Sequence, residues 1–247
     1  MALHILGVMG MSRHLLSRHV FACLSGEQMI LMDLRHDQYL ALSGESSRHL
    51  GQAVLGWPAV RANECDSQRD IDATVADLVA RELLTLDPCR GKSAAIIKQP
   101  PPMRTLLPAA QVCGSALKQR SIRKILRPFR LVIAAIQASV WLRLRDIEWI
   151  VTTLLRKRTP VPIDEAAARE LIASFYEWRP WLFTSNDACL FDSLTLLLFL
   201  RRFAIFPQWI FAVRTGPFAA HCWLQSEDIV LNDTVDHVRS YTPIMSV

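Results

Sequence analysis

Residues 188–200, with the sequence ACLFDSLTLLLFL, predict a helix that is apolar on almost every side. Ser185, Asn186 and Asp187 come directly before this run and are residue types that cap helix N-termini. A helix that is apolar all round has to be buried. The C-terminal part of the chain is therefore expected to fold around this helix.

Cys189 falls in the first turn of the predicted helix. Backbone N–H groups in a first turn lack helical partners and the helix dipole is positive there, so a thiolate is stabilised. Asp192 and Ser193 follow three and four residues later and share the face of Cys189. An isolated cysteine in an apolar helix is usually inert, so a chemical role requires further groups nearby.

A β-hairpin is predicted for residues 220–233, AHCWLQSEDIVLND, with strands at 220–225 and 229–233. Pairing about Glu227 would place His221 directly opposite Asp233 on one side of the sheet. An imidazole and a carboxylate in that position can hydrogen-bond, which fixes the tautomer of the ring. Cys222 should point to the opposite face.

A cysteine at the head of a buried helix, followed by a histidine and an acid on adjacent strands, is the arrangement of papain-like and transglutaminase-like thiol enzymes. In such enzymes the thiolate attacks a carbonyl, the imidazole moves the proton and the carboxylate orients the imidazole. We therefore select Cys189, His221 and Asp233 as candidate catalytic residues. His237 and Asp236 lie beyond the hairpin, and no strand pairing presents them to Cys189.

Three short apolar runs near the N-terminus, at 20–24, 29–33 and 38–42, are separated by the turn-like sequences SGEQ and LRHD. They predict a small antiparallel sheet. Two helices are expected to follow: one capped by Ser46 or Ser47 and running to about Leu55, the other starting at Asp70. The apolar residues of the second recur at helical spacing: Ile71, Val75, Leu78, Val79 and Leu83. Strands and helices together predict a winged-helix-like module.

The charge distribution separates this module from the rest of the chain. Residues 88–145 contain twelve basic and no acidic side chains, although the net charge of the whole chain is only +5. The proline-rich sequence KQPPPMRTLLP at 98–108 cannot continue a helix or a central strand. We therefore predict an α+β protein with an N-terminal module at 1–87, a basic connector at 88–112 and a second domain at 113–247.

The remaining patterns limit the class of protein. The apolar stretch 131–142 is too short to span a bilayer and predicts a buried helix. The helices of this region are expected to be interrupted near Pro128, and Asp164 is expected to cap a later helix. The N-terminus carries no convincing targeting signal, so a cytoplasmic protein is expected. Six scattered cysteines without a CxxC pair predict reduced thiols and no metal site. The basic segment lacks the features of nucleic-acid binding.

The sequence LMDLRHDQYLAL, residues 31–42, resembles the strand–turn–strand of precursor-peptide recognition elements in ribosomal peptide biosynthesis. These elements bind a leader peptide at their third strand. The resemblance implies leader binding at Gln38, Tyr39, Leu40, Ala41 and Leu42, with the helix near 70–84 as the other wall of the groove.

ACLFDSLTL, GPFAAHCWLQ and VLND are together similar to the C-terminal protease domain of lasso peptide B proteins. In that family a Cys-Leu-x-x-Ser-Leu helix precedes a strand with Ala-His-x-Trp and a strand with an aspartate. The resemblance implies Cys189 as nucleophile, His221 as general base and acid, and Asp233 as the orienting group. The chain departs from the family at Cys222, where a small residue such as alanine is expected.

The resemblance implies a fused leader-recognition element and transglutaminase-like cysteine protease that removes the leader from a lasso precursor peptide. A partner, an asparagine-synthetase-like lasso cyclase, would use ATP to close the core peptide, while the protein itself would bind no cofactor. Two alternatives stay open at this stage: a transglutaminase or acyltransferase that transfers to an amine, and a non-catalytic adaptor that delivers the precursor.

Overall fold

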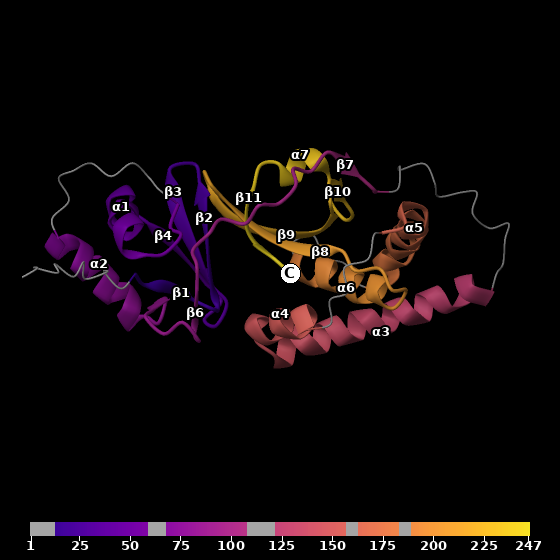
Figure 1. Cartoon of the computed structure of the whole chain (residues 1–247). Helices are drawn as coiled ribbons and strands as arrows, with labels where there is room; N and C mark the ends of the chain where they lie inside the picture. Colours follow the sequence, from indigo (N-terminus) through magenta and orange to yellow (C-terminus); the bar gives the residue numbers. More distant parts are fainter. Residues whose placement is uncertain (1–12, 59–67, 108–121, 157–162, 183–188) are drawn as a thin grey trace, which may run out of the picture. The chain divides into compact units, whose positions relative to one another are not determined.

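The computed structural model describes residues 13–58, 68–107, 122–156, 163–182 and 189–247. These residues divide into two compact units. One contains the chain up to Asp33 together with Leu40–Ile96, and the other contains Leu34–Tyr39 together with Ile97–Val247. Figure 1 labels the helices and most of the strands.

The first unit contains the predicted three-stranded antiparallel sheet, except for Gln38 and Tyr39 at the start of its third strand. Its strands are β2 (Val20–Ser25), β3 (Gln28–Asp33) and β4 (Gln38–Leu42), in the order β2-β3-β4. Ser25 pairs with Gln28, so β2 and β3 are joined by a two-residue turn. Gly26 in this turn has a φ of 62°, the left-handed conformation that such a turn requires.

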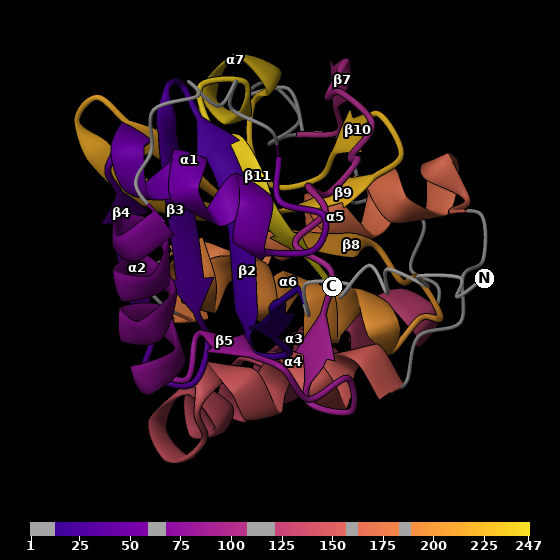
Figure 2. The ribbon, with the colours of Figure 1, turned by 60° about the vertical axis from the view of Figure 1, so that its left-hand side comes forward.

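Two helices, α1 (Gly44–Ala53) and α2 (Gln68–Ala80), lie beside this sheet (Figure 2). The cap of α1 is Ser43, whose Oγ accepts a hydrogen bond from the Ser46 N–H, so the predicted cap at Ser46 or Ser47 was wrong by one turn. Ile71, Val75 and Leu78 of α2 are buried as predicted. Val79 is 41% exposed, because it lies on the outer side of the same helix.

A second small sheet in the first unit was not predicted. It consists of β1 (Leu15–Ser17), β5 (Leu84–Thr85) and β6 (Gly91–Lys92), in the order β5-β1-β6. Leu16 and Leu84 from this sheet contribute to the same core as Leu31 and Leu78. Strands of two or three residues are too short to give an alternating pattern in the sequence.

The second unit is built on a five-stranded sheet in the order β11-β8-β9-β10-β7. The strands are β7 (Arg104–Thr105), β8 (Gln208–Thr215), β9 (Phe218–Ser226), β10 (Ile229–Val230) and β11 (Thr242–Ser246). Only β7 and β10 pair in parallel. The sheet brings the proline-rich segment to the end of the hairpin, although the two are more than a hundred residues apart in the sequence.

Part of the predicted connector hydrogen-bonds to this sheet. The Met103 N–H donates to the Asp228 carbonyl and the Leu106 N–H donates to the Val230 carbonyl, each at 2.8 Å. Gln225 Nε2 also donates to the Pro100 carbonyl at 2.8 Å. The prolines themselves stay outside the ladder, since they have no N–H to donate.

Among the described residues, the second unit has five helices: α3 (Ile122–Leu144), α4 (Ile147–Arg156), α5 (Glu165–Leu182), α6 (Cys189–Arg201) and the short α7 (Val235–Val238). Figure 1 shows α6 between the sheet and α3. Residues 192–200 of α6 are all buried, as predicted. Asp164 caps α5 as predicted, because its Oδ1 accepts the N–H groups of Ala166 and Ala167.

Two predictions about α3 were wrong. The helix continues through Pro128, because a single proline removes one hydrogen bond and the remaining turns still pack against α6. It is also not buried on all sides: Leu131 and Ala138 face the core, whereas Ile133 and Ile136 are at least half exposed. None of the helices among the described residues has the length and hydropathy needed to cross a bilayer.

Candidate active site

Cys189 is the first residue of α6 and is half-buried. The predicted capping residues 185–187 lie outside the described residues. Helix α6 packs along β9, so the start of the helix lies near the strand that carries His221. The position of the thiol at a helix N-terminus follows from the local sequence, and its proximity to the histidine follows from the packing of helix on sheet.

The structure contains the predicted contact between His221 and Asp233, with Nε2 and Oδ2 2.6 Å apart. The predicted strand register was wrong by one residue, however. Ser226 pairs with Ile229 and Gln225 with Val230, so the turn has two residues, Glu227 and Asp228. If β10 had continued in that register, Asp233 would face Cys222 and not His221.

Asp233 reaches His221 because the chain leaves the ladder after Leu231, whose N–H still donates to the Leu224 carbonyl at 2.9 Å. The Asn232 side chain takes over one ladder position, where its Oδ1 accepts the Leu224 N–H at 2.7 Å. Tyr176 donates its hydroxyl proton to the Asn232 carbonyl at 3.1 Å, and Thr105 donates to the Asp233 carbonyl at 2.6 Å. Contacts from α5 and β7 therefore hold the segment that carries Asp233.

Cys189 hydrogen-bonds both His221 and Cys222. These neighbours point to opposite faces of β9, but the Cys222 backbone N–H also hydrogen-bonds the Cys189 sulfur. Since β10 pairs only with Gln225 and Ser226, the sulfur lies at the edge of β9 that no described strand covers at this point. A group at a strand edge can be reached from either face. The predicted opposite orientation of Cys222 therefore does not keep it away from Cys189.

The electrostatics of the site favour a thiolate–imidazolium pair. Hydrogen bonding from Cys222 is the largest influence on the pKa of Cys189; burial opposes it, hydrogen bonding to His221 reinforces it, and the pKa falls to about 4. Burial lowers the pKa of His221, but its hydrogen bonds to Asp233 and Cys189 outweigh this and raise the pKa to about 9. Because Nε2 of His221 is bound to Asp233, the nitrogen left for the thiol is Nδ1.

Comparison with known families places a domain over the part of the chain that carries these residues. The segment 132–246 matches the family model described as "Transglutaminase-like superfamily", and the match includes Cys189, His221 and Asp233. Residues 132–246 form a transglutaminase-like domain. A domain of this kind is consistent with a thiol enzyme. The comparisons with curated proteins and with solved structures gave no match.

His237 also belongs to this site, although its position beyond the hairpin had argued against it. Its Nδ1 lies 2.9 Å from Asp233 Oδ2, and its ring centroid lies 4.7 Å from that of His221. Burial raises the pKa of Asp233, yet hydrogen bonds from both histidines and from the Thr234 N–H lower it below its usual value. The i, i+4 spacing of Asp233 and His237 could have indicated the contact.

Two polar residues of α6 act on the structure around the thiol. Asp192 forms an ion pair with Arg179 of α5, with Oδ1 and Nε 2.6 Å apart. Ser193 donates to the Cys189 carbonyl at 2.6 Å and accepts from Trp209 Nε1 at 2.9 Å. Ser193 Oγ also lies 3.3 Å from Cys222 Sγ. These contacts explain why a nearly apolar helix keeps two polar residues on the face of Cys189.

Among the described residues, His221, Asp233 and His237 offer potential metal-ligand atoms within 4.8 Å of one another. Tetrahedral zinc ligands at about 2.0–2.1 Å from the ion are separated by about 3.3 Å. The 2.6 Å between His221 Nε2 and Asp233 Oδ2 is the spacing of a hydrogen bond. The observed geometry fits proton transfer and not a metal centre, and the predicted absence of a metal stays a prediction.

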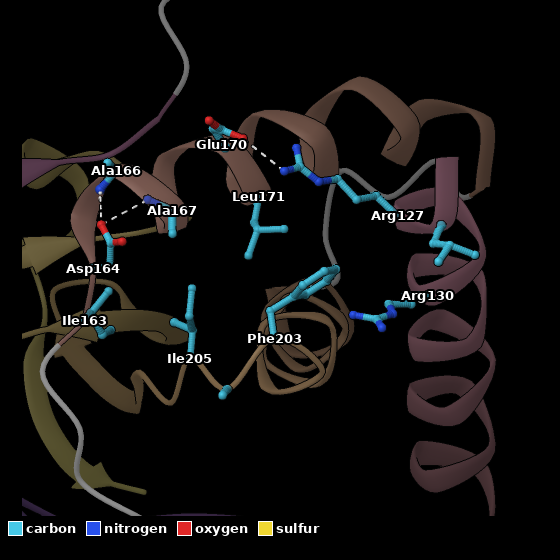
Figure 3. Close-up of a pocket in the computed structure, with 12 residues that line it drawn as sticks. Arg127, Arg130, Ile163, Asp164, Ala166, Ala167, Glu170, Leu171, Phe203 and Ile205 are labelled. Carbon is cyan, nitrogen blue, oxygen red and sulfur yellow. Dashed lines mark hydrogen bonds and ion pairs between the residues drawn. The ribbon is translucent and has the colours of Figure 1, made fainter. Parts of the chain in front are cut away.

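A cavity of about 870 Å³ lies elsewhere in the second unit, between α3, α5 and the segment after α6 (Figure 3). It contains none of the three candidate catalytic residues. Its charged groups have partners within the chain: Arg127 Nη2 lies 2.9 Å from Glu170 Oε2, and Asp164 caps α5. Arg130 donates to the Arg202 carbonyl at 3.2 Å. The cavity therefore supplies no chemistry for the site.

The five residues predicted to bind a leader peptide, Gln38, Tyr39, Leu40, Ala41 and Leu42, are the residues of β4. This strand is terminal in the order β2-β3-β4, so it pairs with β3 along one edge only within that sheet. Gln38 and Ala41 are exposed, whereas Leu42 is buried and Leu40 packs against the core of the first unit.

Proposed function

We propose that the protein is a leader peptidase that cleaves a ribosomal lasso precursor peptide by thiol catalysis. The observation that carries the proposal is the hydrogen-bonded set of Cys189, His221 and Asp233 within a transglutaminase-like domain. The similarity of the surrounding motifs to lasso peptide B proteins supplies the substrate class.

The Cys189 thiolate attacks the carbonyl carbon of the peptide bond that joins leader and core. Protonated His221 donates its proton to the leaving amine, which releases the core peptide and leaves the leader as a thioester on Cys189. His221, now neutral, accepts a proton from water, and the resulting hydroxide equivalent hydrolyses the thioester. Asp233 keeps the imidazole oriented in both steps, and the Cys189 N–H at the start of α6 is one oxyanion donor.

The first unit would supply recognition of the leader. A winged-helix-like module within residues 1–87 offers the outer edge of β4 as a template, and a leader peptide in extended conformation would add a strand there. Backbone hydrogen bonds along Gln38–Leu42 would provide affinity, while helix α2 would provide the other wall. Binding and chemistry would then belong to 1–87 and 113–247, joined by the connector 88–112.

The product has a free α-amine on the core peptide. An ATP-dependent, asparagine-synthetase-like cyclase is the partner that would consume this amine by joining it to a side-chain carboxylate. The peptidase needs no cofactor of its own for the two steps above, because the thiolate, the imidazolium and water account for every bond that forms or breaks.

A transglutaminase or acyltransferase remains the second candidate, because the family match covers enzymes that share this chemistry. In that case an amine would replace water in the second step. The two reactions differ in product mass: hydrolysis adds one water to the cleaved chain, whereas transfer adds the acceptor amine. A precursor-delivery adaptor would leave the substrate mass unchanged.

The test uses the purified full-length protein and the peptide encoded by a short open reading frame beside its gene. Mass spectrometry should show two fragments whose masses sum to that of the precursor plus one water. Cys189→Ala and His221→Ala should abolish cleavage while binding of the precursor persists, and Asp233→Asn should leave residual activity. Cleavage at the wild-type rate by folded Cys189→Ala protein would contradict the assignment.

A further inference from the structure

Cys222 is a second thiol beside the candidate nucleophile, and Ser193 contacts both residues. It is only 3% exposed and is held on the α6 side of β9, with its Sγ 3.3 Å from Ser193 Oγ. Ser193 in turn hydrogen-bonds the Cys189 carbonyl. One serine therefore links the start of α6 to Cys222, and the Cys222 thiol hydrogen-bonds the Cys189 sulfur.

The two thiols differ in their access to solvent. Cys189 is half-buried and can be reached by small molecules, whereas Cys222 is enclosed by the sheet and α6. Burial raises the pKa of Cys222 and keeps it protonated, while Cys189 is ionised. An oxidant that needs a thiolate will therefore react at Cys189 first.

We propose that Cys189 and Cys222 form a reversible redox pair, in which a hydroperoxide oxidises Cys189 and Cys222 then closes a disulfide with it. The proposal deepens the proposed function, because it describes regulation of the same nucleophile. The substrate class of this further reaction is a small hydroperoxide, of which hydrogen peroxide is the simplest.

The chemistry balances in two steps. The Cys189 thiolate attacks one oxygen of the peroxide, the O–O bond breaks, and the products are a sulfenic acid on Cys189 and, after protonation, one water. The Cys222 sulfur then attacks the Cys189 sulfur, an S–S bond forms and the sulfenic oxygen leaves as a second water with the Cys222 proton. Both sulfurs are oxidised by one electron each, and the peroxide is reduced by two.

The geometry favours this outcome over further oxidation. A sulfenic acid that meets no thiol proceeds to sulfinic acid, which ordinary reductants do not reverse. Here the second thiol lies beside the first, with Ser193 linking the two residues, so condensation competes with the next peroxide. Closing the contact to the S–S bond length of about 2.05 Å requires rotation of the two side chains.

The experiment uses the reduced full-length protein treated with hydrogen peroxide, blocked with N-ethylmaleimide and mapped by peptide mass spectrometry. Wild-type protein should yield a linked pair of peptides containing residues 189 and 222, lighter by two hydrogen atoms and separated again by dithiothreitol. In Cys222→Ala protein, dimedone should trap a sulfenic acid on Cys189. Without dimedone, Cys189 should gain two oxygen atoms that dithiothreitol does not remove.

Cys222→Ser serves as a second variant, because it keeps a hydroxyl of similar size and cannot form the bond; its Cys189 should be over-oxidised as in Cys222→Ala. Thermal unfolding of both variants checks that they are folded. Over-oxidation of Cys189 at the same rate in wild type and variants, or a disulfide from Cys189 to a different cysteine, would overturn the proposal.

The mass readout keeps this proposal separate from the proposed function. If the protein forms the 189–222 disulfide but cleaves no precursor, the peptidase assignment is refuted and the redox pair stands. If the protein cleaves the precursor but Cys189 is over-oxidised equally in wild type and in the Cys222 variants, the redox pair is refuted and the peptidase assignment stands.

Discussion

The ionisation of Cys189 can be tested without knowing the substrate. We expect the reaction of Cys189 with iodoacetamide to rise through an inflection near pH 4 in the wild-type protein, since the pKa of this thiol is lowered to about 4. Removing the imidazole with His221→Ala should move the inflection upward. Cys222→Ala should move it further, because hydrogen bonding from Cys222 is the largest of the lowering influences.

The quantity to measure is the pH of the inflection in Cys189 alkylation. The alkylation rate at a single pH is less informative. At pH 6 a thiol with a pKa of about 4 is ~99% ionised, whereas an ordinary thiol of pKa ~8.5 is ~0.3% ionised, a ratio of about 300. Nucleophilicity per thiolate falls with pKa at a Brønsted slope of about 0.4–0.5, which removes about a hundredfold of that advantage over ~4.5 units. The net difference in rate is therefore only about threefold.

The assay is site-resolved alkylation followed by mass spectrometry. The pH values run from below the pKa of Cys189, about 4, to above that of an ordinary thiol, ~8.5. Cys89 is exposed and lies in the first unit, so it serves as the internal control for reagent and pH. Its profile has to be the same in wild type and in every variant. Cys222→Ser is the matched control for Cys222→Ala, because its hydroxyl can still donate to the thiolate.

The same values define a pH window for turnover. Below the pKa of Cys189, about 4, the thiolate is protonated; above the pKa of His221, about 9, the imidazolium loses the proton that the leaving amine needs. Activity should therefore be bell-shaped between these limits. An inflection of Cys189 alkylation at pH 8 or above in folded wild-type protein would refute the ion pair and the reasoning built on it.

Two further predictions concern His237 and strand β4. His237→Ala removes one hydrogen bond to Asp233 and should change the pH profile. For a bond worth about 1 kcal/mol, kcat should fall about fivefold. His237→Gln can still donate and should restore part of the activity. Leu40→Pro and Ala41→Pro should have different effects in the full chain, because successive N–H groups of a strand point to opposite edges. The variant that loses an N–H facing β3 should lose stability. The variant that loses an N–H at the outer edge should lose leader binding alone. Leu40→Ala controls for the lost side chain, and equal leader binding by all three variants would refute recognition at β4.

Several elements of the fold follow from local sequence alone. Helix α6 follows from its composition, because a run of apolar residues on every side of a helix can only be buried. The strands β2, β3 and β4 follow from three apolar runs and two turns. These elements depend on neighbouring residues and on burial, which the sequence displays directly.

The contact between His221 and Asp233 was predicted, but for a reason that the structure corrects. The turn has two residues, and the carboxylate reaches the ring because Asn232 replaces a ladder group and the chain bends away. That bend is held by Tyr176 and Thr105, which come from distant parts of the sequence. A shift of one residue in register reverses the faces of a strand, so local pattern alone could not establish this contact.

The sequence by itself determined a cysteine at a helix start, a histidine on a strand and an acid near the end of the following hairpin, because each depends on secondary structure. Only the tertiary structure decided what surrounds the sulfur. Helix α6 places Cys189 at an open edge of β9, where groups from both faces of the strand can reach it. Cys222 therefore contacts the nucleophile and His237 contacts Asp233, since packing joins residues that no local spacing relates.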